Sequence, residues 1–187
     1  ETRRQAWRLF EAEYSGRSKS AGVTWNLAEE KDYAQWFAEE SGLPERPYAA
    51  GEFAVAPQGD AALLGVYPAG VYSHALSTKH AARLTSDDLT VRPDDQLWVL
   101  ACGDGEAALR FVVQDYPRDG TVYPVKILSR QWRWERFDLS YWAGDRVHIE
   151  LATARDAPLL TKKPARSWFG IRKAMLVARG QPTPVDS

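Results

Sequence analysis

The stretch WRWERFDLSYWAGDRVHIELA, residues 132–152, decides the fold class of this chain. Its second half alternates strictly between apolar and polar side chains, which is the period of two that a half-buried β-strand requires. The apolar face carries Val147, Ile149 and Leu151, and the polar face carries Arg146, His148 and Glu150. In its first half, the side chain of Asp138 can hold a tight bend at 138–140, and Gly144 lets the chain reverse. The stretch therefore predicts two β-strands joined by a sharp corner.

Short β-like runs separated by turn residues fill the chain from residue 51 onward. Residues 51–70 and 95–117 each contain two runs, and the turn Gly103–Asp104–Gly105 in the second is typical of a hairpin. Residues 121–128 and 131–140 look like a further pair, and 167–180 form a long last strand. Many short strands of this kind predict an all-β fold, an antiparallel β-sandwich.

The region before residue 51 has a different pattern. Residues 26–44 predict a short helix, with Asn26 as its cap, Glu29 as the capping-box partner, and Gly42 and Pro44 ending it. We expect residues 1–50 to form a helical or irregular segment packed on the sandwich. Residues 51–180 are expected to form the β-sandwich domain, and residues 181–187 a tail or linker.

The composition of the 187 residues restricts the function. A formal net charge of −1 argues against nucleic-acid binding by phosphate neutralisation. No apolar run approaches the roughly 20 residues that cross a bilayer, which argues against membrane insertion. The single Cys102 allows neither an intramolecular disulfide nor a site built on cysteine pairs. Eight Trp, eight Tyr and six Phe indicate either a large core or rings that stack on flat ligands such as sugars.

Residues 132–152, together with ARLTSDDLTV (82–91) and SWFGIRKAML (167–176), resemble the galactose-binding-like jelly rolls. More closely, residues 69–86, 112–128 and 137–160 resemble the sandwich domain of large multidomain proteins of planctomycetes and related bacteria, which also carry cytochrome-c-like domains. The resemblance covers about residues 50–178. It implies a jelly-roll sandwich within a larger exported bacterial protein linked to polysaccharide use, hence an extracellular or periplasmic location, with neighbouring domains as partners. Domains of this fold serve most often as carbohydrate-binding modules and otherwise as spacers, so the fold alone does not determine the function.

Many galactose-binding-like modules hold a structural calcium ion with an acidic residue on the final strand. The matching stretch here is Ile171–Arg172–Lys173, which has no acid. Acidic side chains occur instead at 87–88, 94–95 and Asp104, and calcium accepts such oxygens. A structural calcium ion is therefore left open, and no other cofactor is expected.

The stretch GVYSHALSTKH, residues 70–80, holds two of the three histidines. His74 and His80 could bind a metal ion, but His148, the remaining histidine, lies far along the chain. Ser73 and Ser77 lack the sequence context of a nucleophile. The stretch could also be a polar crossover between strands. As a ligand-binding loop, it would offer Tyr72, His74, Lys79 and His80 to sugar hydroxyls or anionic groups.

The aromatic residues near the decisive stretch are the stronger functional signal. Trp132 and Trp134 fall on one face of their strand, while Arg133 and Glu135 fall on the other. The two indoles either pack in the core or stack on pyranose rings from the concave outer face. The loop between Tyr116 and Tyr123 is expected at one end of the sandwich, where loops often carry function. Arg110 and Arg118 would add cationic donors there.

These observations favour a non-catalytic carbohydrate-binding module that binds a polysaccharide or oligosaccharide by aromatic stacking and loop hydrogen bonds. The first alternative is a structural or interdomain module without a small ligand. The second is a glycan-active or metal-dependent hydrolase that uses His74 and His80. Hydrolysis of a glycoside usually needs two flanking carboxylates, and no such pair is singled out by the sequence. We therefore predict that the protein is not an enzyme.

Overall fold

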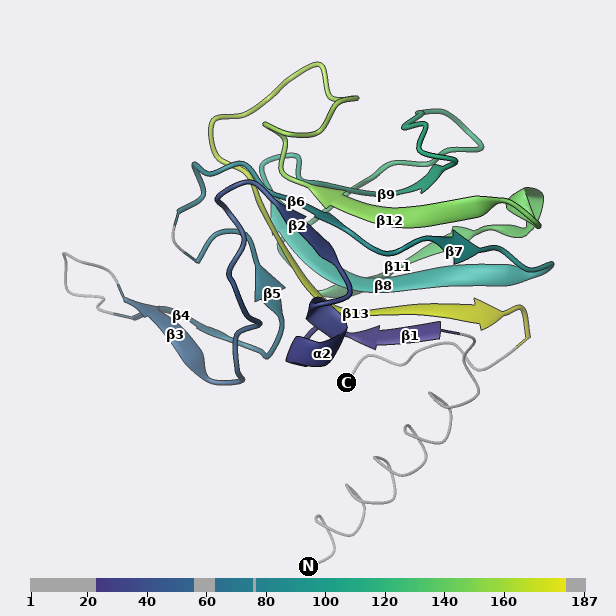
Figure 1. Ribbon diagram of the computed structural model, residues 1–187. Coiled ribbons are helices and arrows are strands. Elements are labelled where there is room, and N and C mark those ends of the chain that lie inside the picture. The colour runs from purple at the N-terminus through teal and green to yellow at the C-terminus, as the bar shows by residue number, and fades with distance from the viewer. Residues whose placement is uncertain (1–22, 56–62, 76, 181–187) are drawn as a thin grey trace, which may run out of the picture.

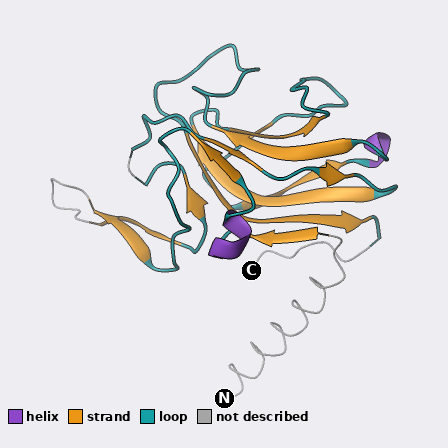
Figure 2. Ribbon diagram, viewed as in Figure 1, coloured by secondary structure: helices purple, strands orange, loops and turns teal. Residues whose placement is uncertain are grey.

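The computed structural model describes residues 23–55, 63–75 and 77–180, and they form two antiparallel sheets packed face to face (Figures 1 and 2). The all-β, antiparallel sandwich predicted from the sequence is confirmed. No helix in these three ranges is long and apolar enough to cross a membrane. Sheet A has the order β1 (Val23–Asn26), β13 (Trp168–Ala178), β8 (Asp95–Asp104) and β11 (Arg133–Asp138), and β5 (Val71–Tyr72) also pairs with β13. Sheet B has the order β10 (Lys126–Ile127), β9 (Ala108–Val113), β12 (Arg146–Ala152), β6 (Arg83–Thr85) and β2 (Phe37–Glu39), and β7 (Leu89–Thr90) also pairs with β12.

The core lies between the two sheets and is filled by alternate residues of their strands. Val147, Ile149 and Leu151 of β12 are fully buried, which confirms the alternation predicted from the sequence. Phe111 of β9 and Phe137 of β11 meet edge to face with ring centroids 5.6 Å apart. Because these two rings come from different sheets, their contact joins the layers.

The corner between β11 and β12 also forms as predicted. Asp138 Oδ1 accepts hydrogen bonds from the Ser140 backbone N–H at 3.1 Å and from Ser140 Oγ at 2.6 Å. A 3-10 turn, η1 (Ser140–Trp142), follows, and Gly144 has a φ of 92°. This positive φ favours glycine, so the residue type matches the reversal into β12.

The hairpin predicted around residues 103–105 is wrong. β8 belongs to sheet A and β9 to sheet B, so the chain crosses from one layer to the other at Gly105, which has a φ of 62°. The runs at 121–128 and 131–140 are likewise split between the sheets, as β10 and β11. Turn residues mark where a strand ends. Which sheet the next strand joins depends on the side of the core against which its apolar face is buried.

The helix predicted over residues 26–44 is also wrong beyond a single turn. Only α2 (Glu30–Tyr33) is helical, and β2 follows it and pairs with β6. The cap position is Glu29, without a side-chain cap bond, while Asn26 ends β1 and donates its amide to the Glu29 carboxylate at 2.8 Å. The reason is tertiary: Trp25 and Leu27 are both buried in the core. Residues two positions apart lie on the same face of a strand but on opposite sides of a helix.

Residues 23–39 thus supply one strand to each sheet, although they lie in the segment predicted to be helical or irregular. The rest of that prediction, over residues 1–22, and the tail at 181–187 lie outside the described residues.

The two runs predicted in residues 51–70 form the hairpin β3 (Glu52–Val55) and β4 (Leu63–Tyr67), which projects from the sandwich (Figure 1). Residues 56–62, which connect these strands, lie outside the described residues. Phe53 and Val66 are directly opposite each other in the hairpin and are 62% and 58% exposed. The hairpin therefore presents an apolar pair to solvent.

Candidate functional site

Trp132 and Trp134 lie outside the core. In the register of β11 with β8, Trp134 is opposite Leu100 and Arg136 is opposite Trp98, whereas Phe137 is opposite the fully buried Leu97. Because side chains alternate along a strand, Trp134 and Arg136 share the outer face of sheet A with Trp98. The sequence left open whether Trp132 and Trp134 lie in the core or on the outer face, and the structure places them on the outer face.

We call this surface the aromatic face and define it by Tyr72, His74, Trp98, Trp132, Trp134 and Trp168. The indoles of Trp98, Trp132 and Trp134 are partly exposed. Between them, Leu100 and Met175 are each only 5% exposed although they point away from the core. The tryptophans thus cover a second, thin apolar layer on the outside of the sheet.

Several polar atoms on this side of sheet A are buried and have no hydrogen-bond partner. They are Thr24 Oγ1, His74 Nδ1, Trp98 Nε1 and Trp134 Nε1. Thr24 shares the outer face because it is opposite Met175, which is opposite Trp98. A buried donor or acceptor without a partner costs about 1–3 kcal/mol, and such groups in native proteins call for an explanation. The indole rings that carry two of these atoms, those of Trp98 and Trp134, are partly exposed.

At one end of the aromatic face, aromatic rings from three separate segments of the chain meet. The Tyr72 ring lies 5.9 Å from Trp132 at 89° and 5.8 Å from His74, and the His74 ring lies 4.2 Å from Trp168. Tyr72 sits opposite Gly170 in β13, where an added Cβ would come within 3.0 Å of its ring. The glycine therefore makes room for Tyr72, which brings together residues that the sequence separates by sixty positions.

His74 is neutral in this environment. Burial lowers the pKa of its imidazole from 6.5 to about 4, and the rings of Tyr67, Tyr72 and Trp168 pack around it. Burial also raises the pKa of the Tyr72 phenol, whose hydroxyl donates to the Pro68 carbonyl at 2.6 Å. Both groups are therefore uncharged at neutral pH.

The lowered pKa of His74 predicts a loss of stability in mild acid. As the pH falls below 6.5, the unfolded chain takes up a proton at this residue before the folded protein does, so stability present above 6.5 is lost on the way to pH 4. Between pH 7 and 5 we expect this residue to remove about 1–2 kcal/mol from the free energy of unfolding. Urea unfolding of wild type and His74→Phe at both pH values measures it. The exposed His80, changed to Phe, is the control and should keep the wild-type dependence; equal losses in all three proteins would contradict the prediction.

A hollow of about 500 Å³ lies beside the aromatic face. Tyr48 lines the hollow, and its ring is 5.9 Å from that of Tyr72 in the aromatic face and 5.8 Å from that of Tyr67. Its polar lining is mostly acidic, and the Arg46 guanidinium lies 3.6 Å from the Glu52 carboxylate. The residues around it are Glu30, Pro44, Glu45, Arg46, Pro47, Tyr48 and Glu52.

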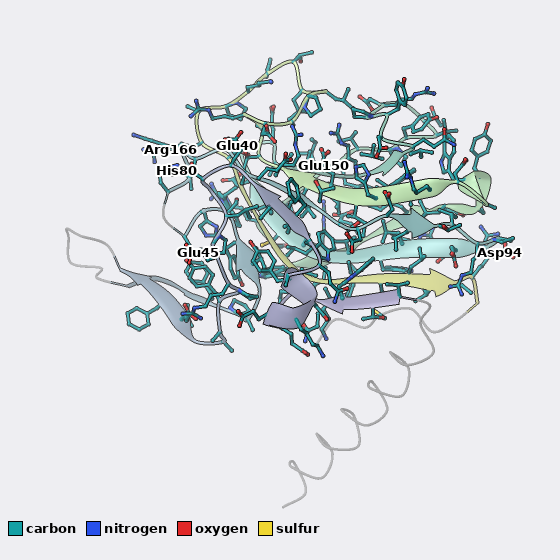
Figure 3. All side chains as sticks on the ribbon, in the orientation of Figure 1. Glu40, Glu45, His80, Asp94, Glu150 and Arg166 are labelled. Carbon is teal, nitrogen blue, oxygen red and sulfur yellow. The ribbon has the colours of Figure 1, made fainter. Side chains whose placement is uncertain are left out.

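Lys79 and His80 belong to the loop before β6, and His80 lies at the end of the sandwich opposite to Asp94 (Figure 3). His80 Nδ1 is 2.9 Å from Ser41 Oγ, and the Lys79 carbonyl accepts a hydrogen bond from Arg155 at 2.9 Å. Lys79 and His80 are both exposed. The two histidines of this loop therefore have different surroundings, since His74 is held among aromatic rings.

Tyr116, Arg118 and Tyr123 form a separate cluster in the loop after β9. The Arg118 guanidinium lies 5.7 Å from the Tyr116 ring centroid and 5.4 Å from that of Tyr123, and it donates to the Tyr123 hydroxyl at 3.2 Å. The Tyr123 ring packs on Trp142 at 4.7 Å. The sequence correctly grouped these three residues, but they satisfy one another and stand apart from the aromatic face.

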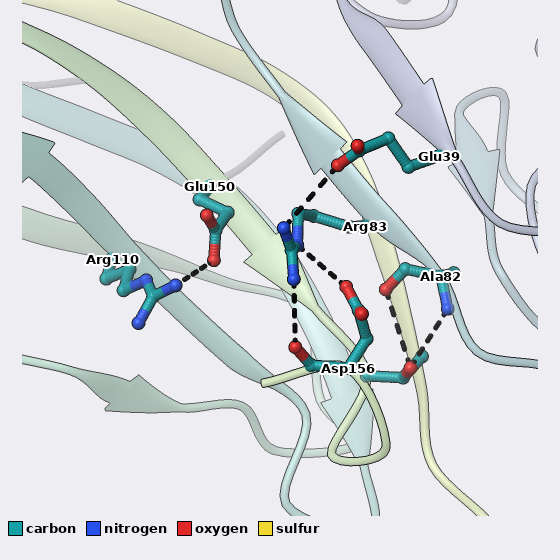
Figure 4. A network of polar contacts seen from close by, with 7 residues as sticks. Glu39, Ala82, Arg83, Arg110, Glu150 and Asp156 are labelled. Atoms are coloured by element: carbon teal, nitrogen blue, oxygen red, sulfur yellow. Dashed lines mark hydrogen bonds and ion pairs between the residues drawn. The ribbon is translucent and has the colours of Figure 1, made fainter. Parts of the chain in front are cut away.

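Arg110 is not a loop-side donor. It lies on the outer side of sheet B, directly opposite Glu150, and the two side chains form an ion pair (Figure 4). Arg110 is 4% exposed and Glu150 6% exposed. The prediction of Arg110 as a ligand contact is therefore wrong, because its side chain is held by Glu150 of the neighbouring strand β12. Arg110 lies within strand β9 and not in the loop that follows it.

A group of possible metal ligands that the sequence did not predict occurs beside β12. Ligand atoms of Asp88, Asp115 and His148 lie within 4.8 Å of one another. The Arg146 guanidinium lies 3.3 Å from Asp88 and 3.0 Å from Asp115, so it already balances both carboxylates. Among the described residues, the side chains placed so that three of them could hold a metal ion are these. His74 and His80, which the sequence offered as metal ligands, do not belong to this group.

Sequence reasoning missed Trp98 and the arginines beside the tryptophans, Arg136 and Arg172. The Arg136 guanidinium lies 5.9 Å from the Trp98 ring, and that of Arg172 lies 5.9 Å from the Trp132 ring. Alternation in the run DQLWVLACGD would have revealed Trp98, since it lies between Leu97 and Val99 and must face the other way.

The chain matches no protein-family model and no curated protein. Among solved structures it is similar to TmCBM61 in complex with β-1,4-galactotriose, with 12% identity, a TM-score of 0.46, and 79% of this chain and 90% of that chain covered. It is also similar to a variant of the family 29 carbohydrate-binding module CBM29-2, with 10% identity, a TM-score of 0.41, and coverage of 88% and 96%. The glycoside hydrolase domain of Endo-D from Streptococcus pneumoniae R6 has 17% identity and a TM-score of 0.41, with 78% of this chain and 22% of that chain covered.

Proposed function

We propose that this protein binds carbohydrate through the aromatic face. The observation that carries the proposal is the set of unpartnered polar atoms among partly exposed indoles: Trp98 Nε1, Trp134 Nε1 and their neighbour Thr24 Oγ1 lie on one sheet face. A pyranose ring offers an apolar C–H face that packs on an indole and hydroxyls that pair with N–H donors. The face therefore combines the two kinds of contact that a sugar requires.

Binding takes place without chemistry on the ligand. The histidine at the aromatic face, His74, is surrounded by rings, and burial holds its pKa near 4, so it is poorly suited to accept a proton at neutral pH. We further propose that the chain serves within a larger exported bacterial protein, where it would hold that protein near a polysaccharide. The resemblance of residues 69–86, 112–128 and 137–160 to exported planctomycete proteins supports this part of the proposal.

Trp134→Ala is expected to weaken binding to the best ligand of a broad polysaccharide panel about 30-fold. A buried tryptophan anchor is typically worth about 2 kcal/mol in an interface, which corresponds to that factor. The variant should still unfold cooperatively, because Trp134 lies outside the core. Isothermal titration and thermal unfolding measure the two properties.

Two further variants make this experiment specific. Phe37→Ala removes an aromatic side chain that is 66% exposed on β2, in the other sheet, and should bind like wild type. Tyr116→Ala tests the cluster in the loop after β9. Loss of binding in Tyr116→Ala with full binding in Trp134→Ala would move the site to that loop, against the proposal.

A second candidate function is that of a structural module that contacts a neighbouring domain. The exposed pair Phe53 and Val66 on the projecting hairpin favours it, because an exposed apolar surface commonly marks a protein contact. If the folded protein binds no polysaccharide of the panel, the carbohydrate proposal fails and this second function is favoured.

A further inference from the structure

We infer that the ligand of the aromatic face is an anionic glycan, one that carries carboxylate or sulfate groups. This inference rests on the proposed function and adds the chemical class of the ligand. It depends on the charges that lie among the indoles.

Two arginines stand beside the tryptophans of this face. Arg136 is on β11, opposite Trp98, with its guanidinium 5.9 Å from that ring centroid. Arg172 is the extra residue where the register of β13 with β8 shifts, and its guanidinium lies 5.9 Å from the Trp132 ring. A guanidinium over an aromatic ring is held in place while its outer N–H groups remain free to donate.

Neither arginine is neutralised by a carboxylate within the described ranges. The ion pairs between described residues involve other basic side chains. Arg172 Nε donates a hydrogen bond to the Ala69 carbonyl at 3.2 Å. A planar guanidinium binds carboxylate or sulfate oxygens with two parallel hydrogen bonds. Arg136 and Arg172 thus retain the capacity to bind an anion.

The acidic residues of the same sheet face are already paired and lie at its two ends. Asp138, at the end of β11, is 2.6 Å from Arg179 and also accepts from Ser140. Asp104, at the end of β8, is 2.7 Å from Arg130. Between them, the outward positions of β8 are Gln96, Trp98, Leu100 and Cys102, none of them acidic. The middle of the aromatic face is therefore positively charged, although the whole chain has a net charge of −1.

The spacing of the two cations indicates a chain with repeated charges. Trp132, under Arg172, and Arg136 are four residues apart, which corresponds to roughly 13 Å along an extended strand. We therefore expect that a ligand longer than one monosaccharide is needed to contact both guanidinium groups. An oligosaccharide with anionic groups on separate units would contact both arginines while its rings pack on the indoles.

The test compares charged and neutral forms of the same polymers in affinity electrophoresis and isothermal titration. Polygalacturonate is paired with its methyl ester, and dextran sulfate with dextran. We expect at least one anionic polymer to bind at least tenfold more tightly than its neutral partner, and the preference to weaken as salt is raised. The uronate and sulfate arms show which anion is preferred.

Arg136→Gln and Arg172→Gln should each reduce binding of the anionic polymer about tenfold or more while leaving the weaker neutral binding unchanged. Lys162→Gln removes an exposed cation from the loop between β12 and β13 and is the control for general attraction of a polyanion. An equal loss in Lys162→Gln would overturn the inference.

Different results would overturn the anionic class of the ligand and carbohydrate binding itself. Equal binding of charged and neutral polymers, abolished by Trp134→Ala, would overturn the anionic ligand and leave carbohydrate binding in place. Absence of binding to all four polymers and to the broad panel, by a folded protein, would overturn both.

Discussion

Glu150→Ala is expected to lower the free energy of unfolding by about 3–5 kcal/mol, since it leaves the Arg110 guanidinium charged and buried without its partner. Arg110 is only 4% exposed, and its Nε already has no hydrogen-bond partner. The Glu150 carboxylate accepts a hydrogen bond from Arg110 Nη2 and balances its charge. Equilibrium unfolding in urea measures the change, which is a large part of the stability of a domain of this size.

The double variant Arg110→Met/Glu150→Leu separates a charge effect from a packing effect. It replaces both charges with apolar groups of similar size and should recover most of the lost stability. Arg130→Ala breaks an exposed pair with Asp104, which water screens, and should cost far less than Glu150→Ala. If Glu150→Ala proves no more costly than Arg130→Ala, the pair does not stabilise sheet B in the way its burial indicates.

Gly105→Ala is expected to cost about 3 kcal/mol or more. Gly105 has a φ of 62°, which costs an L-residue roughly 1–2 kcal/mol. In addition, a Cβ at this position would lie 2.0 Å from the backbone carbonyl oxygen of Arg166, a contact that requires the backbone to move. Because the chain passes from sheet A to sheet B here, the displacement would strain the connection between the layers.

Gly144→Ala is the matched control for this variant. Gly144 also has a positive φ, 92°, but an added Cβ would meet nothing within 4 Å. The difference between the two variants in free energy of unfolding therefore isolates the collision with Arg166. Equal costs would mean that backbone conformation alone makes Gly105 necessary.

The candidate site is only partly visible in the sequence. Trp132 and Trp134 could be placed on one strand face from their spacing, and Tyr72 and His74 were grouped because they are close in sequence. The contact between Tyr72 and Trp132 requires β5 to pair with β13 at Gly170, which no local pattern indicates. Arg136 and Arg172 become relevant only because β11 and β13 flank β8 in one sheet.

By itself, the sequence determined the strands with strong alternation, the corner at Asp138–Ser140 and the sandwich class, because these depend on residues a few positions apart. Tertiary structure alone decided that Gly103–Asp104–Gly105 joins two sheets instead of two paired strands, and that Arg110 is buried against Glu150. It also decided that the tryptophans at β11 face outward. The sequence of a strand does not show which of its two faces packs against the opposite sheet. The physical reason is that strand pairing and the burial of a strand face are set by residues far apart in the chain, whereas turns and alternation are local.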